Sequence, residues 1–410
     1  MRAVAYWGRP DWQMNIEKNF ERLSGSNYDI NHVFHASGYG WPGDWEGRAL
    51  LAFVCHYHIS GRRIPCMDEM MDQLQERTNR HMFFGPESDG QIADEQQLSG
   101  NSWYLRGLME YASAFDSGKA LEAAASTFEN LYERILPLYD RYPLERGEGG
   151  GVSGEVAGTV NGWRLSTDVG CAFMCVDGVS HYYSVTRDKR AGAFLRKVID
   201  VFAGIDIVKY RFQTHTSLTC MRGILRLYET DGDTAYLELV RKLFDRYINE
   251  AMTLTYENYN WFGRPHSWTE PCAVVDSLIL AVWLHRLTGE DRYRTLARRI
   301  WMNGLQFCQR ENGGAGPNSC AIPENPVLEV HMYEADFCCT MRYAEGLRCY
   351  AQSKALFDWD SEAPETVDEY GRRFVDDRLL VMDEKGVRPI FSCNTVPAGE
   401  AKKLRLKVLY

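Results

Sequence analysis

Two short segments place cysteine and carboxylate side chains at the expected starts of helices. One covers residues 268–272, WTEPC in one-letter code, and the other covers residues 336–340, DFCCT. Pro271 suits the first position of a helix, and we expect Thr340 to cap the second helix. The partial positive charge at a helix N-terminus favours thiolate over thiol, so both segments hold cysteines where they ionise readily.

Together the two segments offer one carboxylate and three sulfur atoms: Glu270, Cys272, Cys338 and Cys339. Zn²⁺ binds four such ligands in a tetrahedron, at ~2.3 Å from thiolate sulfur and ~2.0–2.2 Å from carboxylate oxygen. Residues two apart in mid-helix diverge by about 200°, so Glu270 and Cys272 converge only in a turn where the helix begins. Neither segment is a CxxC. Spacing alone therefore also allows buried cysteines that pack as small apolar side chains.

The amino-acid sequence around these segments resembles that of the β-L-arabinofuranosidases of glycoside hydrolase family 127 and their relatives. The resemblance rests on a Glu-x-Cys followed further along the chain by Cys-Cys-Thr, and on GILRLYETDGDTAYLELVRKLFDRYI, WTEPCAVVDSLILAVWLHRLTGEDRY, NGGAGPNSC and CCTMRYAEGL. It covers roughly residues 45–357. It implies an (α/α)6 barrel followed by β-sandwich domains, and retaining hydrolysis of a glycoside by a zinc-bound cysteine.

Carried over by position, the resemblance assigns four zinc ligands: Glu270, Cys272, Cys338 and Cys339. It makes Cys338 the nucleophile. The acid/base glutamate of the family precedes the Glu-x-Cys segment, which matches Glu257 best, with Glu250 as the alternative. Residues 340–342 differ from the Pro-rich version typical of the family. The resemblance therefore defines the sugar substrate less closely than it defines the metal ion. L-Arabinofuranose is the first sugar to test.

The chemistry of such a site is consistent with these residue types. Most retaining glycosidases place two carboxylates ~5–5.5 Å apart, and here a thiolate would replace one of them. A free thiol has a pKa of about 8.5, whereas zinc and a helix N-terminus keep it ionised at neutral pH. Glu257 would protonate the departing glycosidic oxygen and then deprotonate the incoming water.

Four further residues are candidates for contact with a sugar substrate: His215, His331, Trp103 and Trp268. Three thiolates and one carboxylate around Zn²⁺ leave a net charge of about −2, so the two histidines would supply donors that offset it. The two tryptophans would stack on sugar rings. Each of the four also suits an ordinary structural role. His215, Trp103 and Trp268 would then pack in the core, and His331 would lie at the surface.

Helical periodicity predicts the fold class. Apolar residues recur at helical spacing on both sides of a turn at Asp231-Gly232-Asp233, and a similar unit surrounds Gly289. Looser versions of this helix hairpin lie near Gly61, Gly118 and Arg187. With a final helix over roughly 340–356, six helical pairs would close into an (α/α)6 barrel; an open helical array is the alternative.

The ends of the chain have a different pattern. We expect the barrel to occupy residues 1–365, with the first 40 residues, which hold Gly, Trp and His in irregular order, wrapped over its mouth and the Gly-rich stretch 147–158 as a flexible loop. Residues 366–410 contain RLLVMD, VRPIFS and LRLKVLY, which predict a short β-strand tail packed on the barrel.

Composition excludes several function classes. The 410 residues are 45% apolar and 25% charged, with a net charge of −10 and no long basic run. We therefore expect no nucleic-acid or membrane partner. The family resemblance implies a small oligosaccharide or glycoside as substrate, and a homodimer is the assembly to test. The opening residues lack the layout of a secretion signal, which predicts a cytoplasmic protein.

Two other functions stay open. The same barrel could carry a uronic-acid hydrolase or a polysaccharide lyase, which Lys or Arg beside the site would favour. The protein could instead be a non-catalytic sugar-binding protein with a structural zinc, because closed four-ligand zinc sites leave no position for a substrate.

Overall fold

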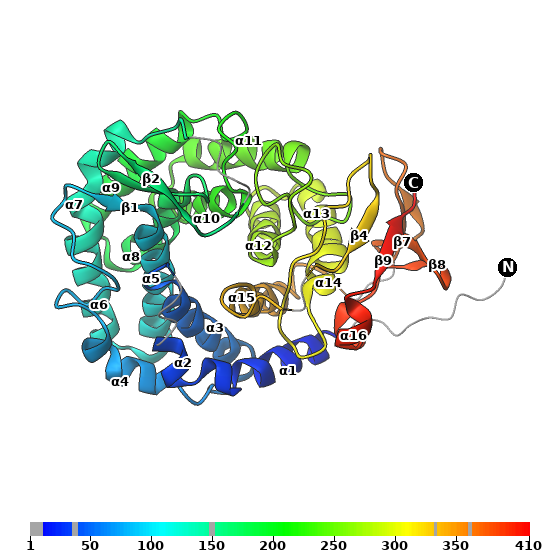
Figure 1. Cartoon of the computed structure of the whole chain (residues 1–410), viewed down its shortest axis with the longest axis horizontal. Helices are drawn as coiled ribbons and strands as arrows, with labels where there is room; N and C mark the ends of the chain where they lie inside the picture. The colour runs from blue at the N-terminus through cyan, green and yellow to red at the C-terminus, as the bar shows by residue number, and fades with distance from the viewer. Residues whose placement is uncertain (1–10, 35–39, 147–151, 332–333, 360–362) are drawn as a thin grey trace. The chain divides into compact units, whose positions relative to one another are not determined.

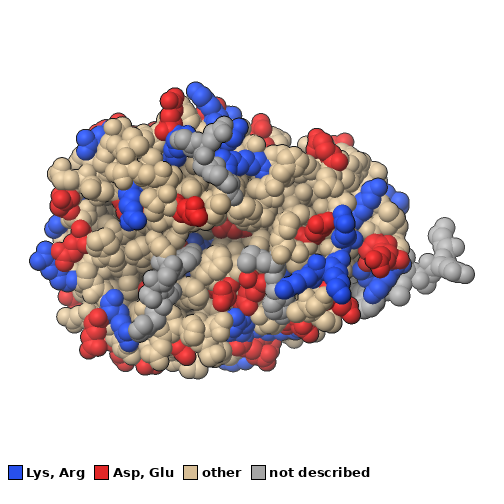
Figure 2. Space-filling model, viewed as in Figure 1, with Lys and Arg blue, Asp and Glu red and all other residues tan. Residues whose placement is uncertain are grey.

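The computed structural model describes residues 11–34, 40–146, 152–331, 334–359 and 363–410 (Figure 1). The chain divides into two compact units. Unit 1 combines Met1–Leu23 with Ile248–Tyr410, and unit 2 is Ser24–Tyr247. Positive and negative side chains are interspersed on the face shown in Figure 2. The expected division of the chain near residue 365 stays a prediction.

Unit 2 is built from consecutive helices joined by short turns. Its α-helices are α2 (Ile30–Phe34), α3 (Asp44–Ser60), α4 (Met67–Arg77), α5 (Glu95–Phe115), α6 (Gly118–Thr127), α7 (Glu133–Ile135), α8 (Cys175–Thr186), α9 (Lys189–Ala203), α10 (Thr214–Asp231) and α11 (Thr234–Glu250), whose last residues belong to unit 1. Short helical turns of other types are η1 (Ser26–Tyr28), η2 (Phe128–Tyr132), η3 (Leu136–Arg141) and η4 (Cys171–Met174).

The predicted hairpin turns are confirmed. Gly61 and Gly232 end α3 and α10 in the left-handed region, at φ of 72° and 79°, and each donates its backbone N–H to the last helical turn. Asp233 then accepts a 3.0 Å hydrogen bond from the N–H of Ala235 at the start of α11. At the looser turn near Gly118, the left-handed residue is Asp116, with φ of 50°.

Small residues let the long helices of unit 2 approach closely. A Cβ at Gly47 on α3 would lie 2.1 Å from the backbone N of Tyr104 on α5. A Cβ at Gly178 on α8 would lie 2.6 Å from the carbonyl oxygen of Ser102, and one at Gly223 on α10 would lie 2.5 Å from the Val176 carbonyl. Three helix interfaces of unit 2, α3–α5, α5–α8 and α8–α10, thus depend on a glycine.

Unit 1 contains helices from both ends of the sequence. They are α1 (Trp12–Leu23), α12 (Pro271–Thr288), α13 (Asp291–Arg299), η5 (Ile300–Leu305), α14 (Gln306–Cys308), α15 (Cys339–Gln352), η6 (Cys393–Thr395) and α16 (Ala398–Ala401). α12 packs against α13 and α15, and α1 packs against α15. Within the first 40 residues, α1 is a helix that packs against α15, and the expectation that this segment wraps over the barrel mouth stays a prediction. Residues 35–39 and 1–10 lie outside the described residues.

The helix α15 begins at Cys339, one residue earlier than the sequence predicts. Pro271 is the first residue of α12, as expected, but the residue before α15 is Cys338 and not Thr340. Thr340 lies inside α15, so the prediction that it caps this helix is wrong. α12 is long and apolar enough to cross a membrane, but 72% of it is buried in the protein, as in the core helix of a soluble protein.

The strands form one sheet in each unit. In unit 2, β1 (Ala93–Asp94), β3 (Trp163–Ser166) and β2 (Val156–Val160) lie in that order. In unit 1 the order is β4 (Val327–Glu329), β9 (Arg405–Val408), β7 (Arg378–Asp383), β6 (Arg373–Val375) and β5 (Thr366–Val367), with β8 (Gly386–Pro389) paired to β7.

These sheets test two predictions. The strand tail is confirmed, because β7, β8 and β9 fall on the three predicted stretches, and β9 pairs with β4 so that Val327 faces Lys407. The Gly-rich stretch is only in part a loop: residues 156–158 belong to β2, which pairs with β3, and residues 147–151 lie outside the described residues.

We predict that Gly223→Ala lowers the free energy of unfolding by about 1–3 kcal/mol, because the new methyl group would overlap the backbone of α8. Gly118→Ala is the matched control, since its Cβ would meet nothing within 4 Å. Urea denaturation of both variants checks this. Equal stability of the two would show that α8 and α10 can separate at no cost.

Candidate metal centre

Three of the four predicted metal ligands converge in unit 1. The sulfur atoms of Cys338 and Cys339 are 3.3 Å apart, and those of Cys272 and Cys339 are 3.6 Å apart. All three lie within 4.8 Å of one another. Sulfur ligands at ~2.3 Å from a tetrahedral zinc would be ~3.8 Å apart, so this group has the size that a metal ion requires. The cluster is thus suited to bind a metal.

The fourth predicted ligand, Glu270, lies at the edge of this cluster. It immediately precedes α12, in extended conformation, and its backbone N–H donates a 3.2 Å hydrogen bond to the side chain of Asn258. A carboxylate oxygen of Glu270 lies within 4.8 Å of the Cys272 sulfur. Glu270 is therefore close enough to complete the three-cysteine group from one side.

The surroundings of the cysteines oppose ionisation in the absence of a cation. Hydrogen bonding to Cys272 and Cys339, together with burial, raises the pKa of the Cys338 thiol well above its usual range. Burial is the largest cause of the raised pKa of Cys339. Because three adjacent thiolates repel one another in a buried site, they become stable only with a positive ion among them.

An ion pair fixes the two helices that carry the cysteines. The guanidinium of Arg342 on α15 bonds to the carboxylate of Asp276 on α12, and it also contacts Glu345. Asp276 and Arg342 are both fully buried, and each is about one helical turn beyond a cysteine of the cluster. A buried pair of this kind holds α12 and α15 in one relative position.

A second network holds the turn before α15. Glu334 accepts two hydrogen bonds from the Arg22 Nε on α1, at 2.9 and 3.1 Å, and one of 2.7 Å from Asn312. Thr340 donates a 2.9 Å bond to Glu334 and accepts a 3.0 Å bond from the backbone N–H of Ala315. The hydroxyl that sequence reasoning took for a helix cap thus ties α15 to the preceding loops.

The predicted acid/base residue Glu257 is deeply buried in unit 1. Its carboxylate accepts hydrogen bonds of 2.9 Å from Thr255, 2.9 Å from Thr269 and 2.8 Å from Asn318. Burial raises its pKa, although these hydrogen bonds oppose the shift. The carboxyl group is therefore biased towards the neutral form that an acid catalyst needs. Its bond to Thr269 also anchors the residue directly before Glu270.

The other candidates in unit 1 are more exposed. Trp268 is half-buried, and its ring meets that of Trp261 edge to face at 5.2 Å. His331 is exposed, in the segment after β4, and Glu250 is exposed at the end of α11. Trp268 therefore keeps part of its surface for a ligand, whereas the position of His331 fits its surface interpretation.

Trp103 and His215 belong to unit 2, where their rings stack at 5.7 Å with an angle of 18° between planes. Both are 1% exposed. The guanidinium of Arg48 lies 4.3 Å from the centre of the Trp103 ring, so the tryptophan is packed against two cationic or ionisable groups. The burial of Trp103 fits its interpretation as a core residue. The side chains of Trp103 and His215 lie side by side.

Glu46 has a strongly shifted pKa that the sequence does not predict. It lies in the first turn of α3, and burial, with Asp44 nearby, raises its pKa to about 8. A carboxyl group protonated at neutral pH is unusual and is found often at functional sites. The signal in the sequence was an acidic residue between tryptophan and glycine at a helix start, which gives no indication of burial.

No protein-family profile and no curated protein matches the sequence, but solved structures resemble it in fold. A GH127 β-arabinofuranosidase aligns over 90% of this chain and 60% of its own, at 13% identity and a TM-score of 0.53. The GH127 β-L-arabinofuranosidase of Geobacillus stearothermophilus T6 aligns over 90% of this chain and 64% of its own, at 13% identity and a TM-score of 0.50. An unsaturated glucuronyl hydrolase specific for heparin aligns over 84% of this chain and 98% of its own, at 11% identity and a TM-score of 0.54.

At these identities the likeness concerns the fold. The chain's own helices confirm the predicted mainly helical class, and the fold likeness to two GH127 structures confirms the structural resemblance to GH127 enzymes. The chain spans 59% of a glycoside hydrolase structure and 60% of the first GH127 structure, so activity, substrate and partners are matters for proposal.

We predict that Asp276→Ala lowers the free energy of unfolding by about 3–5 kcal/mol, because it leaves Arg342 buried with less compensation. Glu365→Ala, which breaks an exposed pair with Arg373, should cost less than about 1 kcal/mol. Chemical denaturation compares the two. Similar small losses would mean that the buried pair does not hold α12 to α15.

We also predict that Glu46 makes stability depend on pH. Its pKa is raised from 4.5 to about 8 in the folded protein, so its contribution is complete below pH 4.5 and is lost as the pH rises towards 8. Relative to wild type, Glu46→Gln should gain stability by a few kcal/mol between about pH 5 and 8. Denaturation midpoints across this range check the trend, and a constant difference would contradict the raised pKa.

Proposed function

We propose that the protein is a retaining glycoside hydrolase that uses zinc held by four ligands: Glu270, Cys272, Cys338 and Cys339. The observation that carries the proposal is the group of three buried sulfur atoms, brought within 4.8 Å of one another from two helix starts far apart in sequence. Soft thiolate ligands in a compact site select zinc over hard cations such as Mg²⁺ or Ca²⁺. The fold likeness to glycoside hydrolases supports a carbohydrate substrate.

The proposed nucleophile is Cys338. It is 7% exposed, against 2% for Cys339 and 0% for Cys272, so it is the sulfur of the three that a substrate can approach best. Zinc, when bound, would keep these thiols ionised at neutral pH. The Cys338 sulfur then attacks the anomeric carbon as the glycosidic oxygen leaves, which forms a thioglycoside bond to the protein.

Glu257 is the proposed acid and base. Its raised pKa favours a protonated carboxyl group, which would give its proton to the departing alcohol. The resulting carboxylate would take a proton from water, which attacks the anomeric carbon and displaces the Cys338 sulfur. The full burial of Glu257 requires that a substrate displace part of its hydrogen-bond network before this transfer.

The substrate we propose is a small glycoside or oligosaccharide, with L-arabinofuranosides first. Trp268 is the proposed stacking surface because it is only half-buried. All twelve cysteines are free thiols, which supports a reducing, cytoplasmic compartment. Nucleic acid and membrane remain outside the proposed partners, and a homodimer remains to be tested.

A non-catalytic zinc site is the second candidate. The observation that favours it is the position of Glu257, which is 0% exposed and already receives three hydrogen bonds from Thr255, Thr269 and Asn318. In that case Glu257 would position the Thr269–Glu270 segment, and zinc would join two loops. The two functions differ in whether Glu257 can be neutralised without loss of metal.

The test combines metal analysis with a panel of p-nitrophenyl glycosides and an unsaturated uronide. We expect about one zinc per chain, with turnover lowered roughly 10³-fold or more by Cys338→Ala. Cys349→Ser is the control, since this cysteine lies on α15 outside the cluster. Full activity of Cys338→Ala would overturn the nucleophile assignment.

Glu257→Gln decides between the two candidates. Normal zinc content with lost turnover supports acid and base catalysis by Glu257. Loss of zinc together with turnover supports a positioning role. Unchanged activity excludes Glu257 from the reaction and directs attention to Glu250.

A further inference from the structure

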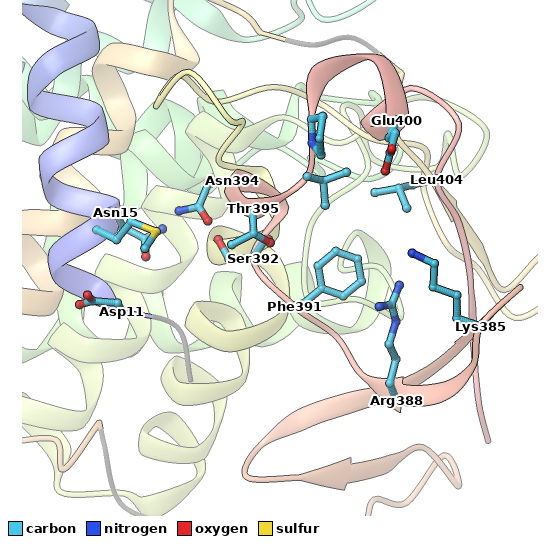
Figure 3. Close-up of a pocket in the computed structure, with 13 residues that line it drawn as sticks. Asp11, Asn15, Lys385, Arg388, Phe391, Ser392, Asn394, Thr395, Glu400 and Leu404 are labelled. Atoms are coloured by element: carbon cyan, nitrogen blue, oxygen red, sulfur yellow. The ribbon is translucent and has the colours of Figure 1, made fainter. Parts of the chain in front are cut away.

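A cavity of about 270 Å³ lies within unit 1, between the start of α1 and the segment from Lys385 to Leu404 (Figure 3). None of the proposed zinc ligands lines it. Its volume is just below the range of ~300–1,000 Å³ typical of drug-sized ligand sites, which suits a ligand of monosaccharide size. Its wall combines apolar side chains with a few polar and charged groups.

One wall of the cavity offers a buried hydrogen-bond acceptor. Asn15 on α1 is 1% exposed, and its amide nitrogen donates to the Gln309 side chain at 2.7 Å and to the Tyr343 hydroxyl at 3.1 Å. The side chain of Gln309 is itself oriented, because its amide nitrogen donates a 2.9 Å hydrogen bond to the backbone carbonyl of Asn15. The amide of Asn15 therefore has a defined orientation.

This orientation leaves the Asn15 side-chain oxygen without a hydrogen bond from any of the described residues. A buried acceptor in that state is stabilised by a donor, and hydroxyl groups are donors. A ligand in the cavity can provide one. The acceptor thus distinguishes a hydroxylated ligand from a purely apolar one.

The opposite wall is cationic and aromatic. Lys385 lies in the turn between β7 and β8, Arg388 lies on β8, and both reach the cavity beside Phe391 (Figure 3). The guanidinium of Arg388 lies 4.3 Å from the centre of the Phe391 ring and also pairs with Asp383. Lys385 is exposed and makes no ion pair with the described residues, so its charge is available to a ligand carboxylate.

The third part of the wall is Glu400 on α16, which Figure 3 shows away from Asn15 and on the same side as Leu404. Like the Asn15 oxygen, its carboxylate accepts hydrogen bonds. The cavity therefore presents acceptors, a cation and an aromatic ring around one space. Acceptors match sugar hydroxyls, the ring matches an apolar sugar face, and Lys385 matches a carboxylate.

We propose that this cavity is a second, non-catalytic site for a monosaccharide that carries a carboxylate, such as a hexuronate. The carboxylate binds Lys385, one face of the ring packs on Phe391, and a hydroxyl donates to the Asn15 oxygen. The proposal is independent of the proposed hydrolase function, because it shares none of the zinc ligands with it.

The test is calorimetric titration of the purified protein with D-glucuronate. D-Glucose, which lacks the carboxylate, and cyclohexanecarboxylate, which lacks the hydroxyls, should each bind at least about tenfold more weakly. An equal affinity for glucose would indicate a neutral-sugar site and overturn the carboxylate assignment. An equal affinity for cyclohexanecarboxylate would overturn the role of Asn15.

Two variants locate the binding. Lys385→Met should weaken glucuronate binding about tenfold and Phe391→Ala by a similar factor, with hydrolysis unchanged. Lys403→Met is the matched control, because this exposed lysine does not line the cavity. Binding that is unaffected by Lys385→Met, or absent at concentrations on the order of 10 mM, overturns the proposal. Cys338→Ala should bind glucuronate normally, which separates this site from the proposed catalytic one.

Discussion

Three sulfur atoms within 4.8 Å of one another, almost fully buried, cannot all be anionic unless a cation lies among them. This electrostatic constraint connects the rest of the structure. The cysteines lie at the starts of α12 and α15. About one helical turn further along, the ion pair between Asp276 and Arg342 holds the two helices together. The site is therefore built by the helices themselves, and a metal ion would complete it.

Two buried or part-buried carboxylates support the two segments that carry the cysteines. Glu334 links α1 to Thr340 in α15, and Glu257 links to Thr269 directly before Glu270. Both carboxylates lie outside the cysteine cluster and act on the segments that carry it. Such outer contacts fix the geometry of metal ligands in general. Glu257 therefore anchors the segment that carries Glu270 and Cys272, in addition to its proposed role as an acid.

The helical elements were predictable from the sequence because they follow local rules, whereas the proposed ligand set came from the family resemblance. Periodic apolar residues and left-handed glycines such as Gly232 define helices and turns, and Pro271 marks a helix start. The environment of a side chain depends on residues distant in sequence. The helix α1 as partner of α15, the burial that raises the pKa of Glu46, and the hydrogen bonds that enclose Glu257 all required the folded chain.

Zinc K-edge X-ray absorption of the purified protein tests most directly which ion binds between the three sulfurs. We predict a four-coordinate ion with three sulfur neighbours at ~2.3 Å and one oxygen neighbour at ~2.0–2.2 Å. The sulfur contribution should fall by one third in Cys339→Ala. A protein purified with no zinc, or with zinc bound only to nitrogen and oxygen, would contradict it.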